Sequence, residues 1–174
     1  MTSSDTLSVT VRFATPGDMP ALGLLFEAMY ADWGVAAPAQ GNDLAANLTD
    51  AMMSEDGRFE VLIAVLEGEG VGFAAFGTVF EPAFLGSGGF LRDVFVVPQH
   101  RRKGAGANLM HFLLAEAGKR QWVSLDWHVN RLDFDARTFF EIIAPDSYTV
   151  DRLVHRIEGE TLTKQASLSG QLIA

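Results

Sequence analysis

The chain has 174 residues, 48% of them hydrophobic, which is enough to bury one core of ordinary size. It carries 22 acidic and 13 basic residues, and the net charge of −9 disfavours binding to duplexes, so we expect no nucleic-acid partner. It contains no Cys, which excludes disulfides, thiolate metal sites and a Cys nucleophile, and we expect no metal centre.

No stretch approaches roughly 18 uninterrupted apolar residues, and the first five residues lack the features of a secretion signal, so we expect a cytoplasmic protein with no membrane span. The charge is unevenly spread. Residues 1–91 hold two basic and twelve acidic residues, a charge of −10, whereas residues 92–174 hold eleven and ten, a charge of +1. This predicts that the first half handles a cation and the second an anion; the alternative is a solvated acidic surface.

Hydrophobic periodicity predicts ten elements in the order β-α-α-β-β-β-α-β-α-β. In the first half they are a strand at 9–13, helices at 19–33 and 42–53, and an antiparallel hairpin of strands at 59–66 and 71–80. In the second half a Gly-rich connection at 82–89 precedes a strand at 90–97, a helix at 104–119, a strand at 122–129, a helix at 134–143 and a strand at 148–157.

This order is typical of a mixed sheet flanked by helices, an α/β (α+β) fold. We expect one domain over residues 1–174, with its core at about 9–162 and a tail at 163–174 to which the sequence assigns no role.

The segment from Val94 to Met110 carries the strongest chemical signal. A strand ends at Pro98, three basic residues and Gly-Ala-Gly follow, and a helix begins. Such a turn directs several backbone N–H groups to one spot, where the glycines let a diphosphate approach the backbone. The sequence fits neither a Walker loop nor a dinucleotide fingerprint. An ordinary tight turn is the alternative, but the three bases and the following helix favour an anion site.

The run Arg101-Arg-Lys-Gly-Ala-Gly106 resembles the Arg/Gln-x-x-Gly-x-Gly/Ala motif of the GNAT superfamily of N-acetyltransferases. The preceding strand, Leu91 to Pro98, and the segment Val154 to Leu162 look like the diamine acetyltransferase-like branch, and Asp133 to Phe140 is similar to the superfamily's Asn-x-x-Ala-x-x-Phe-Tyr helix. The resemblance implies a mostly antiparallel sheet with a splay between the strands at 94–97 and 122–129, into which the pantetheine arm of acetyl-CoA inserts.

The resemblance also implies which residues bind the cofactor. Main-chain groups of Phe95 and Val97 would pair with the pantetheine, and an N–H near Val97 would polarise the thioester carbonyl. The full set implied to contact acetyl-CoA is Phe95, Val96, Val97, Arg101, Arg102, Lys103, Gly104, Ala105, Gly106, Ala107, Asn108, Asp133 and Phe140.

Two positions depart from the family pattern. Phe140 stands where the superfamily often has a Tyr that protonates the leaving thiolate, so we expect slower catalysis or another donor, such as Tyr148, His128 or a water. Asp133 stands in place of an Asn, and capping of the helix that begins at Phe134 is the alternative to a cofactor contact.

The acceptor amine must lose a proton before it attacks, and His128 and Asp93, which flank the expected splay, are the candidate bases. Tyr148 completes the candidate catalytic set. Candidate substrate contacts are Glu27, Tyr30, Asp32, Trp33 and Glu81.

The resemblance therefore implies an acetyl-CoA-dependent N-acetyltransferase that acts on the primary amine of a small molecule, such as a polyamine or an amino-acid-like amine, by direct attack in a ternary complex. A catalytically weak acyl-CoA-binding module and a nucleotide- or phosphate-binding domain are the alternatives. We also expect a homodimer.

Overall fold

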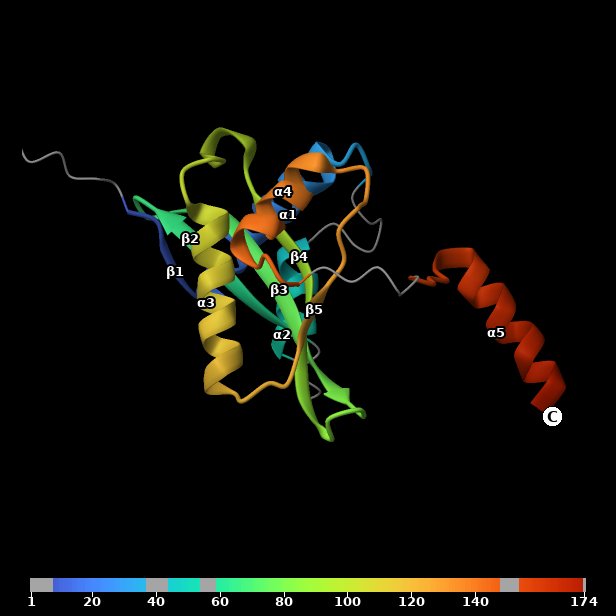
Figure 1. Ribbon diagram of the computed structural model, residues 1–174. Coiled ribbons are helices and arrows are strands. Elements are labelled where there is room, and N and C mark those ends of the chain that lie inside the picture. The colour runs from blue at the N-terminus through green and yellow to red at the C-terminus, as the bar shows by residue number, and fades with distance from the viewer. Residues whose placement is uncertain (1–7, 37–43, 54–58, 148–153, 174) are drawn as a thin grey trace, which may run out of the picture. The chain divides into compact units, whose positions relative to one another are not determined.

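Figure 1 shows the computed structural model, which describes residues 8–36, 44–53, 59–147 and 154–173. The chain divides into two compact units, residues 1–143 and 144–174. The first unit contains a five-stranded sheet with its helices, and the second contains helix α5 (Gly159–Ile173). Across the described ranges, no helix combines the length and apolar character needed to cross a bilayer.

The sheet has the strand order β1-β2-β3-β4-β5. Its strands are β1 (Thr10–Phe13), β2 (Glu60–Leu66), β3 (Glu69–Glu81), β4 (Gly86–Val96) and β5 (Leu125–Trp127). Neighbouring strands are antiparallel except β4 and β5, which run parallel. The turn between β2 and β3 has two residues, Glu67 and Gly68, both with positive φ, as tight hairpins require. The expected mixed, mostly antiparallel α/β fold is confirmed.

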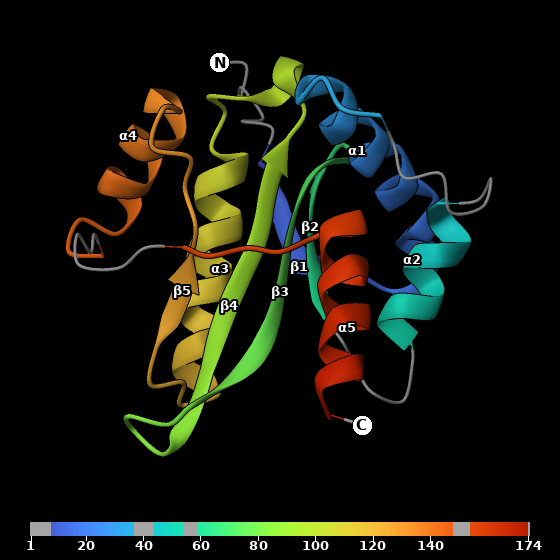
Figure 2. The same cartoon turned by 90° about the vertical axis from the view of Figure 1, so that its right-hand side faces the viewer.

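Helices α1 (Met19–Asp32) and α3 (Ala105–Lys119) cover opposite faces of the sheet. Side chains alternate between the two faces along each strand, so each helix packs against a different set of strand residues. On one face Phe26 of α1 stacks on Phe73 of β3, with ring centroids 4.3 Å apart. On the other, Phe112 of α3 meets the ring of Phe13 edge-on at 5.6 Å. Figure 2 shows α3 running along the strands.

Two further helices pack against this frame. Helix α2 (Leu44–Met53) lies against α1, where Gly23 faces Ala45: a Cβ at Gly23 would make an ordinary contact with Ala45 at 3.6 Å. Helix α4 (Phe134–Ile143) lies by the N-terminal end of α3, where the Phe139 ring would meet a Cβ on Gly106 at 3.4 Å.

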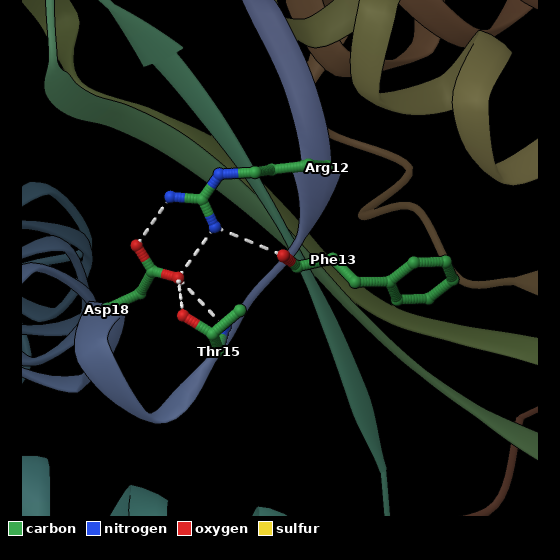
Figure 3. A network of polar contacts seen from close by, with 4 residues as sticks. All are labelled: Arg12, Phe13, Thr15 and Asp18. Carbon is green, nitrogen blue, oxygen red and sulfur yellow. Dashed lines mark hydrogen bonds and ion pairs between the residues drawn. The ribbon is translucent and has the colours of Figure 1, made fainter.

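An ion pair joins β1 to the start of α1 (Figure 3). Two guanidinium nitrogens of Arg12 donate to the two carboxylate oxygens of Asp18 at 2.6 and 2.7 Å, and the backbone N and Oγ1 of Thr15 donate to the same carboxylate at 2.8 and 2.7 Å. These hydrogen bonds, chiefly those from Arg12, hold the pKa of Asp18 far below its usual value. The chain reversal before α1 is therefore fixed by charge-assisted bonds.

Some predicted boundaries are wrong. Strand β4 begins at Gly86 rather than at residue 90, because Gly88 and Gly89 carry no side-chain signal; each lies where a Cβ would collide, at Gly89 with the Trp122 ring. Strand β5 spans three residues instead of 122–129. Residues 154–157 form no strand, and 148–153 lie outside the described residues. The unassigned tail is helical, as α5.

Candidate functional site

Strands β4 and β5 pair over only three residues, Gly89 to Leu91 of β4 with Leu125 to Trp127 of β5. Beyond Leu91, β4 continues to Val96, and among the described strands it pairs there with β3 alone. We call residues 92–96 the open edge of β4. It supplies the unpaired strand backbone that the predicted splay requires.

A β-bulge decides which residues turn their backbone to the open edge. Ala75 pairs with Asp93 and Phe76 with Leu91, which leaves Arg92 as an extra residue in β4. Before the bulge, odd-numbered residues face β5: the N of Gly89 donates to the O of Ser124 at 2.9 Å. After it, odd-numbered residues face β3: the N of Val97 donates to the O of Val71 at 3.0 Å.

The backbone groups that face the open edge therefore belong to Val94 and Val96, because strand residues alternate in direction. This corrects the expectation for Phe95 and Val97. The N–H of Val97 is bonded within the sheet and its carbonyl accepts from the N of His100 at 2.9 Å, while the Phe95 side chain is buried against α1. Sequence reasoning missed Val94 because a bulge leaves no mark in a hydrophobic strand.

The start of α3 forms an anion cradle, which we define as the backbone of residues 104–107. Gly104 caps the helix with φ of 87°, in the left-handed region. The first hydrogen bond of the helix runs from the N of Asn108 to the O of Gly104, so the amides of residues 105–107 have no acceptor within the helix. A Cβ on Gly106 would lie 3.8 Å from Val96, so the cradle adjoins the open edge.

The basic residues before the cradle differ from one another. Arg102, with φ of 61°, has a side chain that is 85% exposed and touches Asp135 only loosely, at 3.4 Å, and Lys103 is also exposed. Both side chains directly precede the cradle in the chain and are open to solvent. Arg101 instead bonds to the carbonyl of Val96 at 2.8 Å and to Asp32 at 2.6 Å.

Two other predicted cofactor contacts have partners inside the protein. Asn108 donates through Nδ2 to the carbonyl of Val9 at 3.2 Å, which ties α3 to the chain before β1. The Oδ1 of Asp133 accepts from the N of Ala136 at 2.9 Å, so Asp133 caps α4. The capping alternative thus holds for Asp133.

Phe140 lies on α4 beside the last paired residue of β5. Its side chain is 9% exposed and packs against Trp127 at a centroid distance of 5.3 Å and against Phe139 at 5.0 Å. It offers no proton. Tyr148, which was expected to compensate, lies outside the described residues.

On the α1 face of the sheet the charge of Asp93 acts on Tyr30 of α1. Asp93 lies two residues before Phe95 and shares its face, where Phe95, Phe73, Phe26 and Tyr30 form a chain of ring contacts. Burial, and next the negative charge of Asp93, raise the pKa of Tyr30. The pair therefore combines a carboxylate with a phenol that stays protonated.

The other candidate base and substrate residues are exposed or lie far from Asp93. His128 follows β5, is exposed, and meets the Phe90 ring edge-on at 5.0 Å. Glu27 is exposed on α1, and Trp33 is exposed just after it. Glu81 sits at the β3–β4 turn, opposite Gly86, which is seven residues and roughly 23 Å along the strand from Asp93. The structure does not bring Glu81 to this site.

Comparisons with known proteins identify the family and the fold. Residues 25–142 match the model of the acetyltransferase (GNAT) family. An uncharacterized N-acetyltransferase of Archaeoglobus fulgidus is 34% identical over 84 residues, 46% of this chain and 55% of that protein. An L-ornithine N5-acetyltransferase of Arabidopsis thaliana is 36% identical over 59 residues, 30% of this chain and 26% of that one. The aligned parts thus span about half and a quarter of these relatives.

The fold is also found among solved structures. An integron cassette protein from the mobile metagenome of V. cholerae superposes with a TM-score of 0.75 at 24% identity, covering 92% of this chain and 98% of that one. At this identity the likeness concerns the fold. The family match spans well over half of the sequence and includes the open edge, the anion cradle and α4, and on that ground the chain belongs to the GNAT acetyltransferase family.

Proposed function

We propose that the protein is an acetyl-CoA-dependent N-acetyltransferase that acetylates the primary amine of a small molecule by direct attack in a ternary complex. The observation that carries this proposal is the continuity of two features, an anion cradle at the start of α3 and the open edge of β4 beside it. Together they offer amide donors for a diphosphate and unpaired strand backbone for the amide-containing arm that follows it.

The residues present fit coenzyme A. The amides of residues 104–107 would hold the diphosphate, with Arg102 and Lys103 adding charge. The N–H and carbonyl of Val94 and the N–H of Val96 would pair with the pantetheine, which would then run along β4 toward Asp93. The Val96 carbonyl already accepts from Nε of Arg101. The cofactor supplies an activated acetyl thioester, and the family to which the chain belongs uses acetyl-CoA.

The acceptor would approach from the α1 face. We assign Asp93 as the group that removes the proton from the ammonium, because it lies where the open edge begins and beside Tyr30. In the reaction the amine nitrogen bonds to the acetyl carbon, the carbon–sulfur bond breaks, the amine proton passes to Asp93 or water, and the thiolate leaves. His128, exposed beyond β5, is the alternative base.

We infer a small cationic acceptor, amino-acid-like or a polyamine. The first half of the chain, which includes α1, carries a charge of −10, and the related Arabidopsis protein is named for L-ornithine, an amino acid with a side-chain amine. Arg92 lies beside Asp93, with its Nε 3.9 Å from the carboxylate, where a second acid would have favoured a diamine. This favours an acceptor with one cationic amine near Asp93.

Phe140 favours a second candidate, a catalytically weak acyl-CoA-binding module, because its ring carries no hydroxyl at the position where the family often has a Tyr that protonates the leaving thiolate. Two measurements separate the possibilities. Calorimetric titration with acetyl-CoA, CoA and ATP tests whether the protein binds coenzyme A. Tight binding of ATP alone would refute both the acetyltransferase and the acyl-CoA-binding module. Release of free thiol with a panel of amines then tests catalysis, and CoA binding without release would leave the binding module.

A further inference from the structure

The side chain of Arg101 joins the turn before α3 to two other parts of the fold, the end of β4 and the end of α1. Its Nε donates to the carbonyl of Val96, the last residue of β4, at 2.8 Å. Its Nη2 donates to Oδ2 of Asp32, the last residue of α1, at 2.6 Å. Its guanidinium carbon lies 5.6 Å from the centre of the Phe95 ring. Arg101 itself stands in the turn from Pro98 to Gly104, which leads into the anion cradle and which we call the cradle turn.

These contacts limit what Arg101 can do. A guanidinium presents its N–H donors in one rigid plane, so a fork held at Nε and at Nη2 cannot turn to a diphosphate without losing both bonds. The partner carboxylate is 28% exposed and the Arg101 side chain 44%, so water screens this pair less than a fully exposed one.

The bond from Arg101 to the Val96 carbonyl lies at the open edge of β4. The N–H of Val97, in the same peptide unit, points to β3, so the Val96 carbonyl points to the open edge. Arg101 therefore occupies one acceptor of that edge and ties the end of β4 to the cradle turn. Asp32 supplies the counter-charge from α1, 69 residues away in sequence.

We propose that Asp32 is a positioning residue for coenzyme A: it holds Arg101 across the end of β4 and thereby fixes the cradle turn in the shape that presents the amides of α3. The inference rests on the proposed function. It leaves Arg102 and Lys103 as the cations that reach the diphosphate, and it couples the cofactor turn to α1, the helix that carries Tyr30.

The test is calorimetric titration of CoA, with steady-state kinetics, on the full chain and its variants. Asp32→Asn is expected to weaken CoA binding and to raise KM for acetyl-CoA about fivefold, with kcat at saturation changed less than about twofold. Asp32→Glu should recover most of the affinity. Arg101→Lys should weaken binding as much as Asp32→Asn although it keeps the charge, because Lys cannot bond both partners.

The double variant Asp32→Asn/Arg101→Lys should bind no more weakly than either single variant, because both remove the same connection. The matched control is Glu141→Gln, which removes one negative charge from an exposed pair with Arg137 on α4 and should leave CoA affinity unchanged. If Asp32→Asn binds CoA with unchanged or higher affinity, the inference is overturned, because Arg101 would then either bind the phosphate directly or have no role in CoA binding. If the wild-type chain binds no CoA, the proposed function fails and this inference fails with it.

Discussion

The backbone conformation of Gly104 sets the direction of the first amides of α3. Its φ of 87° is left-handed, and a Cβ there would meet nothing within 4 Å. A side chain at this position would therefore act through the backbone, at a cost of roughly 1–2 kcal/mol, rather than through a clash. The glycine is needed to turn the chain into α3 with its first amides directed at one point.

We predict that Gly104→Val weakens CoA binding at least about tenfold and lowers Tm by several degrees, because relaxation of the strained turn displaces the amides of the cradle. Calorimetry and thermal denaturation measure the two effects. Gly118→Ala is the control: it lies in the same helix with open space around it, and it should raise stability by up to about 1 kcal/mol without changing CoA affinity. Unaltered affinity in Gly104→Val would place the diphosphate elsewhere.

Phe140 cannot donate a proton to the leaving thiolate of coenzyme A. We predict that Phe140→Tyr raises kcat for thiol release by about tenfold, because the new hydroxyl supplies the missing acid to a thiol that already leaves tolerably near neutral pH. The matched change Phe134→Tyr adds a hydroxyl to the same helix at a side chain that is 71% exposed, and it should have no effect. If folded Phe140→Tyr shows an unchanged kcat, proton supply does not limit the reaction.

For Asp93 the prediction concerns pH. Asp93→Asn should lower kcat/KM about a hundredfold at pH 7, and the deficit should shrink as the pH approaches 10, where an alkyl amine loses its proton without help. A pH profile of thiol release measures this. His128→Gln serves as the comparison, and a larger loss in that variant would transfer the role of base to His128.

At the scale of elements, the bonds among Arg12, Thr15 and Asp18 fix the entry into α1, the helix that carries Tyr30 and Asp32. Because the folded pKa of Asp18 is depressed, the unfolded chain binds the proton more tightly. The stabilisation is therefore fully present above the unfolded pKa of about 3.9 and is lost as the pH falls below it.

We predict that Asp18→Asn lowers the free energy of unfolding by about 1 kcal/mol at pH 7, and that its difference from wild type narrows between about pH 4 and pH 2. Urea denaturation at several pH values measures both quantities. The control variant Glu141→Gln, at an exposed carboxylate, should change the free energy of unfolding by less than about 0.5 kcal/mol at every pH. A deficit that stays constant down to pH 2 would contradict the assignment.

At the scale of the whole molecule, every buried apolar side chain among the described residues lies between Met19 and Phe140, and the family match ends at residue 142. The core thus belongs to the first compact unit. We predict that a chain ending after Glu158, without α5, keeps its CoA affinity within about twofold and its Tm within a few degrees. Calorimetry and thermal scans test this, and loss of cooperative unfolding would show that α5 belongs to the folded core.

The order of the first four helices and of the five strands, and the antiparallel pairing of β2 with β3, follow from the sequence alone, which also predicts the place of the anion cradle. These features follow from local rules: periodicity, turn composition, and glycines placed between a strand and a helix. It predicted less well where local signals are weak, as in the glycines that open β4 and in the tail that forms α5.

The directions in which the groups of the site point depend instead on tertiary packing. The bulge at Arg92 exchanges the two sets of residues along β4, so Val94 and Val96, rather than Phe95 and Val97, turn their backbone to the open edge. Asp32 of α1 likewise binds the side chain of Arg101, and Asp93 of β4 lies near Tyr30 of α1. The physical reason is common to all three: which way a group points depends on strand register and on partners distant in the chain, and composition and spacing do not encode either.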